Sequence, residues 1–267
     1  MRIKWQAAIF TAALAFTFAG CGGGEKPAPE SSTAPASAPA GGGAAVDATT
    51  AGSVSGTVNL DGPAPTFKAI NMSAEAFCSK AHTSAVMPED VVTGDKGALA
   101  NVVVYVKDDM SKYSFDTPKD PVALDQRGCM YSPHVVALMA GQTIEVKNDD
   151  QTTHNIHPTP KDNREWNQSQ PPGAAPLDET FARGEVAIPV KCNVHPWMKG
   201  YIAVFKHPFF AVTTKDGKFE LKGLPPGTYT IEAWQEKYGV VDQQVTIGPK
   251  DSKTVSFTFK AAGATGD

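Results

Sequence analysis

A short segment around residue 195 carries three side chains that bind metals. Cys192, His195 and Met198 follow one another at Cys-x2-His-x2-Met spacing, and a histidine pair, His154 and His157, lies upstream after a strand-like run. One thiolate, two imidazoles and a distant thioether are the ligand set of a mononuclear blue-copper site. Because the ligands come from two separate parts of the chain, a fold that holds them must bring these two parts together.

The two upstream histidines compete for one place in this set. Residues three apart on a strand face opposite sides, so only one of the two histidines is expected to bind. We predict His154, which directly follows a turn, together with Cys192 and His195 as the strong ligands and Met198 as the long axial ligand of one type 1 copper ion. His157 is the alternative ligand. Met198 as core filler and a closed zinc site are the competing interpretations, and the methionine in the loop favours copper.

Other functional classes receive little support from the sequence. The net charge of −4 with mixed signs does not suggest a nucleic-acid surface. No Ser-His-Asp set in a known context and no glycine loop followed by lysine is recognisable, and only one copper-type set is visible. We therefore expect a protein that is not an enzyme.

The N-terminal part has the features of an export signal. Residues 1–21 combine a positive start with an apolar stretch, residues 7–18, that is too short to span a bilayer comfortably. The stretch ends in Phe-Ala-Gly-Cys, which resembles a bacterial lipobox, so Cys21 is expected to carry lipid. Cleavage near Ala19 without lipid is the alternative. The prediction is a protein in the periplasm or at the cell surface, with the outer membrane weakly favoured.

Low-complexity segments flank the predicted folded part. Residues 22–52 are rich in Gly, Ala, Pro, Ser and Thr and contain almost no large apolar side chains. Such a composition cannot bury enough apolar surface to fold, so we expect a flexible tether between membrane and folded part. Residues 261–267 are expected to be a flexible tail.

The four cysteines can be divided by chemistry. Cys21 is assigned to the lipid and Cys192 to the metal, which leaves Cys78 and Cys129. An even pair in an exported protein is expected to form a disulfide, since disulfides persist in oxidising compartments. Two buried free thiols are the alternative.

Strand signals dominate the folded part. Alternating or β-branched runs are broken by Gly, Pro, Asn and Asp. One helix is predicted at residues 73–81, with Ser73 as its N-cap. The class is therefore all-β, in the form of sandwiches. The predicted strands cover residues 53–60, 100–107, 122–124, 135–139, 143–146, 185–190, 201–205, 218–221, 228–234, 240–247 and 255–259.

Residues 119–206 resemble a cupredoxin of the amicyanin or plastocyanin-like kind. The residues that carry the resemblance are Tyr131-Ser132-Pro133, Ala140-Gly141-Gln142-Thr143-Ile144, Asn148-Asp149-Asp150, His154-Asn155, and the run from Cys192 through Met198 and Gly200 to Val204. The resemblance implies a Greek-key β-sandwich that binds copper and transfers electrons. It also implies that Asn155 hydrogen-bonds across to the ligand loop and supports it from outside the ligand set.

A second resemblance covers residues 207–260. The segments Asp216-Gly217-Lys218-Phe219 and Gly223-Leu224-Pro225-Pro226-Gly227-Thr228-Tyr229 are similar to a carboxypeptidase regulatory-like, transthyretin-like sandwich, a fold also found in domain II of rhamnogalacturonan lyases. Residues 53–118 fit the opening of the same fold. We therefore expect one discontinuous sandwich, 53–118 plus 207–260, with the cupredoxin inserted. Two consecutive domains, or one merged sandwich, are the alternatives.

The functional prediction follows from both resemblances. We expect a lipid-anchored, extracytoplasmic protein that carries single electrons between redox protein partners. A non-redox module that binds polysaccharide or a protein is the alternative from another class, with Trp234 and Tyr238 as a platform or as ordinary core residues. Copper storage or delivery with the same ligands is a third hypothesis.

Overall fold

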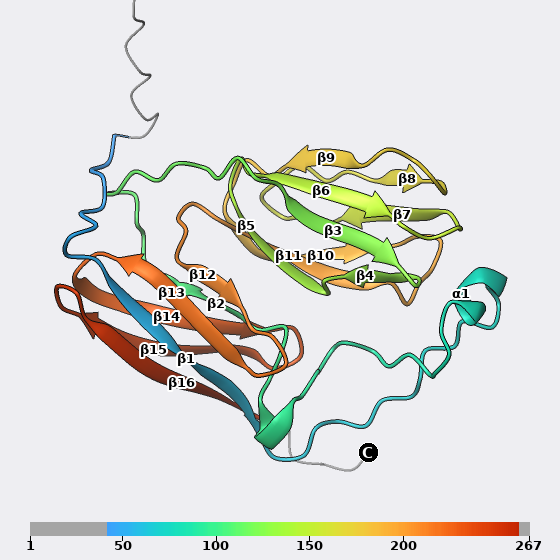
Figure 1. The fold of residues 1–267 in the computed structure, drawn as a ribbon, viewed down its shortest axis with the longest axis horizontal. Coiled ribbons are helices and arrows are strands. Elements are labelled where there is room, and N and C mark those ends of the chain that lie inside the picture. The colour runs from blue at the N-terminus through green and yellow to red at the C-terminus, as the bar shows by residue number, and fades with distance from the viewer. Residues whose placement is uncertain (1–41, 262–267) are drawn as a thin grey trace, which may run out of the picture. The chain divides into compact units, whose positions relative to one another are not determined.

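The structure is a computed structural model that describes residues 42–261. The predicted signal peptide, Cys21, residues 22–41 of the predicted tether and residues 262–267 of the tail lie outside the described residues. No helix within residues 42–261 is long and apolar enough to cross a membrane. The strands and helices (Figure 1) are β1 Gly52–Asp61, α1 Ala76–Lys80, a 3₁₀ helix Asp95–Gly97, β2 Val103–Val106, β3 Val122–Arg127, β4 Met130–Ser132, β5 Val135–Met139, β6 Thr143–Asn148, β7 His154–Pro158, β8 Gln168–Gln170, β9 Leu177–Thr180, β10 Glu185–Lys191, β11 Lys199–Phe205, β12 Phe210–Val212, β13 Lys218–Leu224, β14 Gly227–Gln235, β15 Gly239–Ile247 and β16 Ser252–Lys260. The prediction of an all-β chain is confirmed.

Strands β3 to β11 form a two-sheet sandwich, which we call the insert sandwich. One sheet has the order β5-β11-β10-β7-β8 and the other the order β4-β3-β6-β9. Along β6, Ile144 and Val146 are buried while their neighbours are half-buried, which is the alternation expected of a strand with one face on a core. The polar segment between residues 158 and 177, whose shape the sequence left open, contributes β8 to the first sheet.

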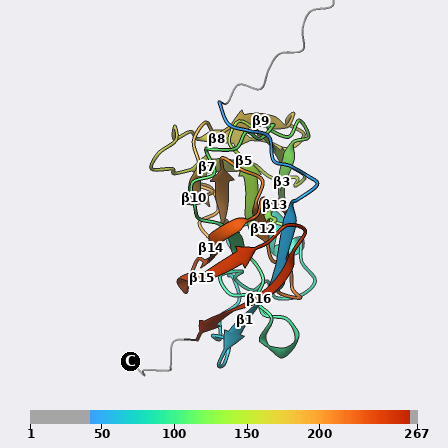
Figure 2. The same ribbon diagram turned by 90° about the vertical axis from the view of Figure 1, so that its left-hand side faces the viewer.

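The other strands form a second sandwich, which we call the host sandwich. Its sheets have the orders β13-β1-β16 and β12-β2-β14-β15. Strands β1 and β2, which precede the insert sandwich in sequence, each lie between two strands that follow it, as Figures 1 and 2 show. Without β1 and β2, each sheet of the host sandwich would therefore be interrupted, and the strands on either side of the gap would have backbone groups without partners.

The chain between β1 and β2 leaves the host sandwich as a long segment, and residues 63–92 of it are called the strap. The strap carries α1, which is bonded to the insert sandwich by the Cys78–Cys129 disulfide. The helix covers Ala76–Lys80, shorter than predicted, and no side chain caps it. Ser73 is not the N-cap, because the helix begins only at Ala76 and Glu75 occupies the N-cap position.

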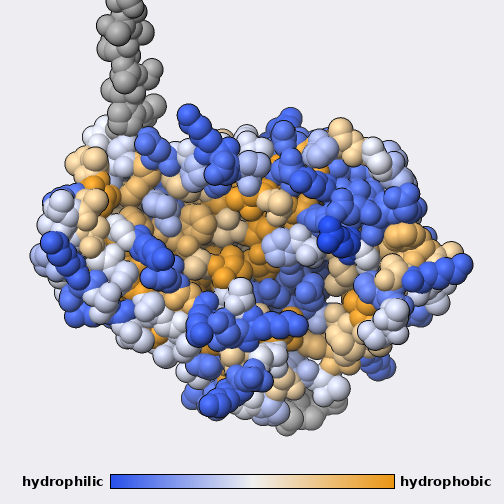
Figure 3. All heavy atoms as spheres, in the orientation of Figure 1, coloured by the Kyte–Doolittle hydropathy of each residue, from blue (hydrophilic) through white to orange (hydrophobic). Residues whose placement is uncertain are grey.

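An apolar cluster joins the two sandwiches. Val103 and Tyr105 of β2 pack with Val135 of β5 and with Ala203 and Phe205 of β11. The rings of Tyr105 and Phe205 lie 4.8 Å apart between centroids. On the face drawn in Figure 3, apolar residues gather over the region of β5, β11 and β12, where this junction lies. The junction supports the insert sandwich on the host without involving the predicted ligands.

Candidate metal centre

The loop between β10 and β11 places three of the predicted ligands together. Pairing of Lys191 with Lys199 closes the two strands. The Cys192 N–H donates to the Met198 carbonyl at 3.1 Å, and the Met198 N–H donates to the His195 carbonyl at 2.9 Å. The loop is therefore compact and internally bonded. It turns the side chains of Cys192, His195 and Met198 toward the interior of the insert sandwich.

His154 reaches the same interior from the first residue of β7. Strand β7 pairs with β10, and Lys191 lies opposite His157. The neighbouring position, Cys192, then lies close to the start of β7, since the Asn155 N–H contacts its sulfur. The antiparallel pairing of β7 with β10 thus brings together predicted ligands that lie far apart in the sequence.

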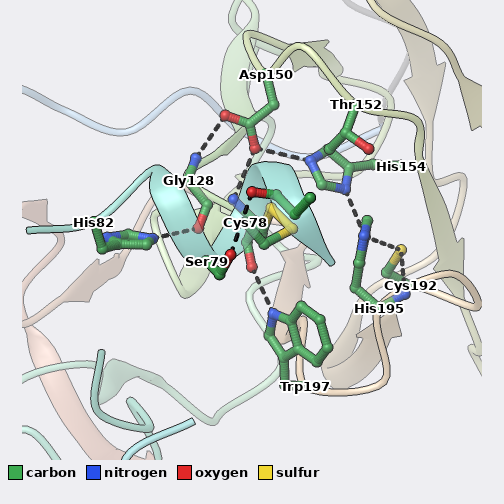
Figure 4. The surroundings of a disulfide bond; sticks show 12 residues. Cys78, Ser79, His82, Gly128, Asp150, Thr152, His154, Cys192, His195 and Trp197 are labelled. Atoms are coloured by element: carbon green, nitrogen blue, oxygen red, sulfur yellow. Dashed lines mark hydrogen bonds and ion pairs between the residues drawn. A yellow bond between two sulfur atoms is a disulfide. The ribbon is translucent and has the colours of Figure 1, made fainter. Parts of the chain in front are cut away.

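The three strong-ligand candidates converge tightly, as Figure 4 shows. Nδ1 of His154 lies 2.9 Å from Nδ1 of His195, and Cys192 Sγ lies 3.8 Å from the latter atom. Both imidazoles are fully buried, and Cys192 is 3% exposed. Two ring nitrogens and one sulfur therefore face a common point that is shielded from solvent.

Hydrogen bonds prepare the sulfur to act as a thiolate. The backbone N–H groups of Asn155 and His195 point at Cys192 Sγ at 3.5 and 3.4 Å. Burial alone would raise the pKa of the thiol, but a hydrogen bond from His154 and these backbone donors lower it below its usual value. A thiolate is the form that binds metals.

Asp150 orients His154, a role that the sequence did not reveal. Its Oδ2 lies 2.8 Å from His154 Nε2. The carboxylate also accepts the N–H groups of Gly128 and Cys129 at 2.7 Å each, which anchors it to the turn between β3 and β4. With its Nε2–H directed at Asp150, His154 keeps Nδ1 for a metal, the usual arrangement of a supported histidine ligand. Asp150 stands four residues before His154, but acidic residues are common in turns and carry no specific signal.

The pKa values of the two histidines are shifted in opposite directions. Burial would lower the pKa of His154, but the hydrogen bond to Asp150 and the nearby Cys192 raise it. Burial and the neighbouring His154 lower the pKa of His195. A metal ion therefore competes with a proton at His154 and finds His195 already neutral.

Met198 and Asn155 lie near the three converging groups. Met198 is fully buried in the apolar cluster that includes Cys192. Asn155 accepts the Asn193 N–H with Oδ1 and donates from Nδ2 to Asn167 Oδ1. The amide thus ties the start of β7 to the ligand loop. Axial coordination by Met198 stays a prediction.

His157 points away from the three converging groups. Its Nε2 lies 2.6 Å from Glu165 Oε1, and its Nδ1 contacts Asn193. Of the two histidines, only His154 belongs to the buried cluster. The opposite faces predicted for residues three apart on a strand account for this difference.

His195 is covered by Trp197 and by the strap. The Trp197 ring packs on it with centroids 5.1 Å apart, and the Trp197 indole N–H donates to the Cys129 carbonyl at 3.0 Å. The strap adds a second cover, since a ring nitrogen of His195 and the sulfurs of Cys78 and Cys129 lie within 4.8 Å of one another (Figure 4). His195 Nε2 has no hydrogen-bond partner within residues 42–261.

Residues outside the ligand set differ in exposure and packing. Ile202 is fully buried in the insert core, whereas Val194 is 46% exposed. Trp234 packs on Tyr201 at the junction, whereas Tyr238 packs on the host core. Trp234 and Tyr238 thus belong to separate clusters and do not form one platform for a ligand.

The donor set fits a copper ion. It provides two imidazole Nδ1 atoms and a thiolate around one buried point, with a thioether in the same cluster. Soft sulfur stabilises Cu(I), and imidazoles suit both oxidation states. His154, Cys192 and His195 would hold the metal, which would supply a one-electron redox couple.

Comparison with known proteins gives one match to a family model. Residues 202–260 match the model of the carboxypeptidase regulatory-like domain family. This match begins inside β11, a strand that pairs within the insert sandwich. No curated protein matches the chain.

Solved structures similar to this chain include copper proteins. A Cu-containing nitrite reductase from Thermus scotoductus SA-01 is 22% identical with a TM-score of 0.31, over 36% of this chain and 24% of that one. A purple cupredoxin from Nitrosopumilus maritimus is 22% identical with a TM-score of 0.27, over 31% of this chain and 98% of that one. An amicyanin mutant in its Cu(I) form is 20% identical with a TM-score of 0.28, over 33% of this chain and 86% of that one. Cupredoxins and a carboxypeptidase regulatory-like domain are thus the known proteins that this chain resembles.

Proposed function

We propose that the protein binds one copper ion in the insert sandwich and carries single electrons between redox protein partners. One observation carries the proposal: His154, His195 and Cys192 converge in the buried interior with their Nδ1 and Sγ atoms within 4.8 Å of one another. The lowered pKa of the Cys192 thiol supports a metal-bound thiolate. In this view the protein is a carrier and not an enzyme.

The enclosure of the ligands favours electron transfer over copper storage or delivery. His154, His195 and Met198 are fully buried, and Cys192 is nearly so. Delivery requires ligands that a receiving protein can replace one by one, which is difficult at a closed site. Electron transfer requires only that the redox centre of a partner come close to the metal. A rigid site changes its geometry little between the two oxidation states.

The proposed location follows from the N-terminal sequence. Lipid at Cys21 and the Gly- and Pro-rich segment after it would tether the protein to a membrane outside the cytoplasm. The partners would be redox proteins that reach the site from that compartment. A role in polysaccharide binding has no comparable cluster of groups to support it.

Titration of the purified protein with Cu(II) tests the proposal. We expect an intense thiolate-to-copper charge-transfer absorption in the visible region at one copper per chain, bleached by ascorbate and restored on reoxidation. Cys192→Ser removes the thiolate and should abolish the absorption. His157→Ala is the matched control, since His157 lies outside the cluster, and should leave the absorption unchanged.

Two results would contradict the proposal. One is a colourless protein that binds Zn²⁺ tightly through Cys192 and the histidines, which would indicate a closed zinc site. The other is loss of the absorption in His157→Ala but not in a His154→Ala variant, which would transfer the ligand role to His157.

A further inference from the structure

The groups that enclose the predicted ligands come from two kinds of structure. Asp150 and the loop that carries Cys192 belong to the insert sandwich and are bonded to its backbone. The strap is different, because it leaves the host sandwich after β1 and reaches the metal centre with α1 (Figure 4). There the sulfurs of Cys78 and Cys129 and a ring nitrogen of His195 lie within 4.8 Å of one another. The strap therefore closes one side of the centre from outside the insert sandwich.

Few hydrogen bonds tie the strap to the insert sandwich. Within residues 42–261 no backbone-to-backbone hydrogen bond joins the two, and the strap belongs to no sheet. His82 Nε2 contacts the Gly128 carbonyl at 2.7 Å, and Lys199 contacts Asp90 near the end of the strap. A segment without a ladder of backbone hydrogen bonds opens at a lower free energy than a sheet does. The strap is thus the part of the enclosure that opens most easily.

The packing beneath the strap is also incomplete. Met72 and Cys78 of the strap are buried against the insert core. A cavity of about 290 Å³ nevertheless lies between the strap and the side chains of Met130 and Trp197, and a second of about 210 Å³ is lined by strap residues alone. The interior of a folded domain contains few voids larger than a water molecule. The strap therefore lies on the insert sandwich as a cover and is not part of its core.

One covalent bond supplements these weak contacts. The Cys78–Cys129 disulfide joins α1 to the turn between β3 and β4, whose N–H groups hold Asp150. The Cys129 carbonyl also accepts the indole N–H of Trp197, whose ring packs on His195. A cross-link limits how far the segments that it joins can separate. The bond therefore lies at the place where the strap would have to lift to uncover His195.

The ring of His195 has one nitrogen on each side of this boundary. Nδ1 lies 2.9 Å from His154 Nδ1 and faces the cluster. The two nitrogens of an imidazole point in roughly opposite directions, so Nε2 faces outward, and it is buried without a hydrogen-bond partner within residues 42–261. Water would supply that hydrogen bond once the cover is removed. Exposure of His195 Nε2 is therefore a direct measure of whether the strap is open.

We propose that the strap is the lid of the proposed metal site: the ion enters and leaves on the side of His195 when the strap swings out, and the Cys78–Cys129 bond holds the lid shut. The disulfide thereby slows exchange of the ion, because the closed lid separates His195 from water and from competing chelators. The identity of the ion rests on the proposed copper function. The opening of the lid does not, so it can be measured without metal.

Acylation of the metal-free protein by diethyl pyrocarbonate, mapped by mass spectrometry, tests the lid. The reagent attacks unprotonated imidazole nitrogens, so His195 reacts when it is uncovered. Replacement of both cysteines, Cys78→Ser with Cys129→Ser, should speed the acylation of His195 about tenfold or more, because the strap then opens more often. His157 lies outside the cluster and should react at the same rate in both proteins. Equal acylation of His195 in the parent and the double variant would overturn the proposal.

Loss of the disulfide also lowers the overall stability, so the matched control is a variant that is destabilised elsewhere. Leu138 is fully buried in the insert core and lies opposite Val204, at the end of β11 remote from the ligand loop. Leu138→Ala should lower the stability to a comparable degree and leave the strap bonded. Its His195 should be acylated at close to the parent rate. Acylation as fast as in the double variant would mean that the site opens by general unfolding, and it would refute the lid.

Copper exchange distinguishes this proposal from the proposed function. The charge-transfer absorption should develop about tenfold faster in the double variant than in the parent, and a chelator should bleach it faster by a similar factor. Equal rates in the two proteins, with normal absorption, would refute the lid and leave the copper function intact. Faster acylation of His195 in the double variant without any absorption would support the lid and contradict copper binding.

Discussion

The two sandwiches have the same architecture but different interiors. The host core is built almost entirely from aliphatic and aromatic side chains, such as Phe219 and Phe257, whose rings lie 5.8 Å apart. Most of the buried polar side chains lie in the insert sandwich, namely Gln126, His134, Gln142, Asn148, Asp150, His154, Asn155, Gln170 and His195. We therefore expect the host interior to contribute through packing alone and the insert interior to hold the proposed metal as well.

The polar interior of the insert sandwich is organised by a hydrogen-bond network. Gln126 Nε2 donates to Gln170 Oε1 at 2.6 Å, and Gln170 Nε2 donates to the Val146 carbonyl at 3.0 Å. Asn148 Nδ2 bonds the Gln170 carbonyl at 2.8 Å. Such networks contribute little net stability but fix one arrangement of side chains. A metal site with small rearrangement between oxidation states needs that property.

The largest expected effect comes from opening a cavity in the host core. Phe257→Ala removes a fully buried ring and should lower the free energy of unfolding by about 3–5 kcal/mol. Guanidinium unfolding measures the change. Val240→Ala, at an exposed position of the same sandwich, should stay within about 0.5 kcal/mol of the parent. A loss below about 1 kcal/mol for Phe257→Ala would contradict the assignment of stability to the host core.

The second-largest expected effect on stability comes from removing the disulfide that holds the strap. The Cys78–Cys129 disulfide spans 51 residues and joins the strap to the insert sandwich. Replacing both cysteines by serine should cost about 2–4 kcal/mol, because the unfolded chain regains the freedom of a long loop. Thermal and denaturant unfolding measure the loss. The parent protein under strong reductant should behave like the double variant. Equal stability of oxidised and reduced protein would mean that the strap is held by its other contacts.

Asp150 offers a test of the polar interior. Asp150→Asn weakens three hydrogen bonds to the carboxylate, so we expect a stability loss of about 1–3 kcal/mol. Copper affinity should fall about 10- to 100-fold because His154 loses its orienting partner. Asp149→Asn is the neighbouring control, since this carboxylate is 45% exposed and pairs with Arg127 at the surface. If both variants bind copper equally well, Asp150 does not position the ligand.

The smallest effect is a pH dependence at the start of β10. Glu185 accepts three backbone N–H groups of residues 161–163 and the Asn163 side chain. Burial would raise its pKa, but these hydrogen bonds lower it below the ordinary value of 4.5. A carboxyl whose folded pKa is depressed stabilises the protein above the unfolded pKa and loses this contribution as pH falls through the folded pKa.

Glu185→Gln should therefore lose about 1 kcal/mol at pH 7, a value reduced for partial exposure. The difference from the parent should shrink as pH falls below about 4.5. Unfolding measured at several pH values provides the comparison. Asp178→Asn, at an exposed position of β9, should show little change in stability at neutral pH. A difference that grows toward acid pH would reverse the sign and refute the role of the charge.

Local sequence patterns predicted much of the fold and three of the side chains, His154, Cys192 and His195, that converge in the buried cluster. The runs at Val103–Val106, Val135–Met139 and Thr143–Asn148 have β-branched or alternating patterns and are strands. The short strands β4, β7, β8, β9 and β12 are missing from the predicted strands, and β8 and β9 lie near segments rich in Pro, Asn and Gln that carry no strand pattern. The helix was predicted too long at its N-terminal end, because a turn in which the Glu75 N–H donates to the Met72 carbonyl precedes its start at Ala76.

The amino-acid sequence by itself determined the all-β class and the ligand types, because alternation and Cys-x2-His-x2-Met spacing are local properties. Tertiary structure decided the rest. Only the pairing of β7 with β10 places His154, and not His157, beside Cys192 and His195, and only the β3–β4 turn brings Asp150 its backbone donors. The strap over His195 and the cavity beneath the strap depend on contacts between residues far apart in the chain, which no local pattern records.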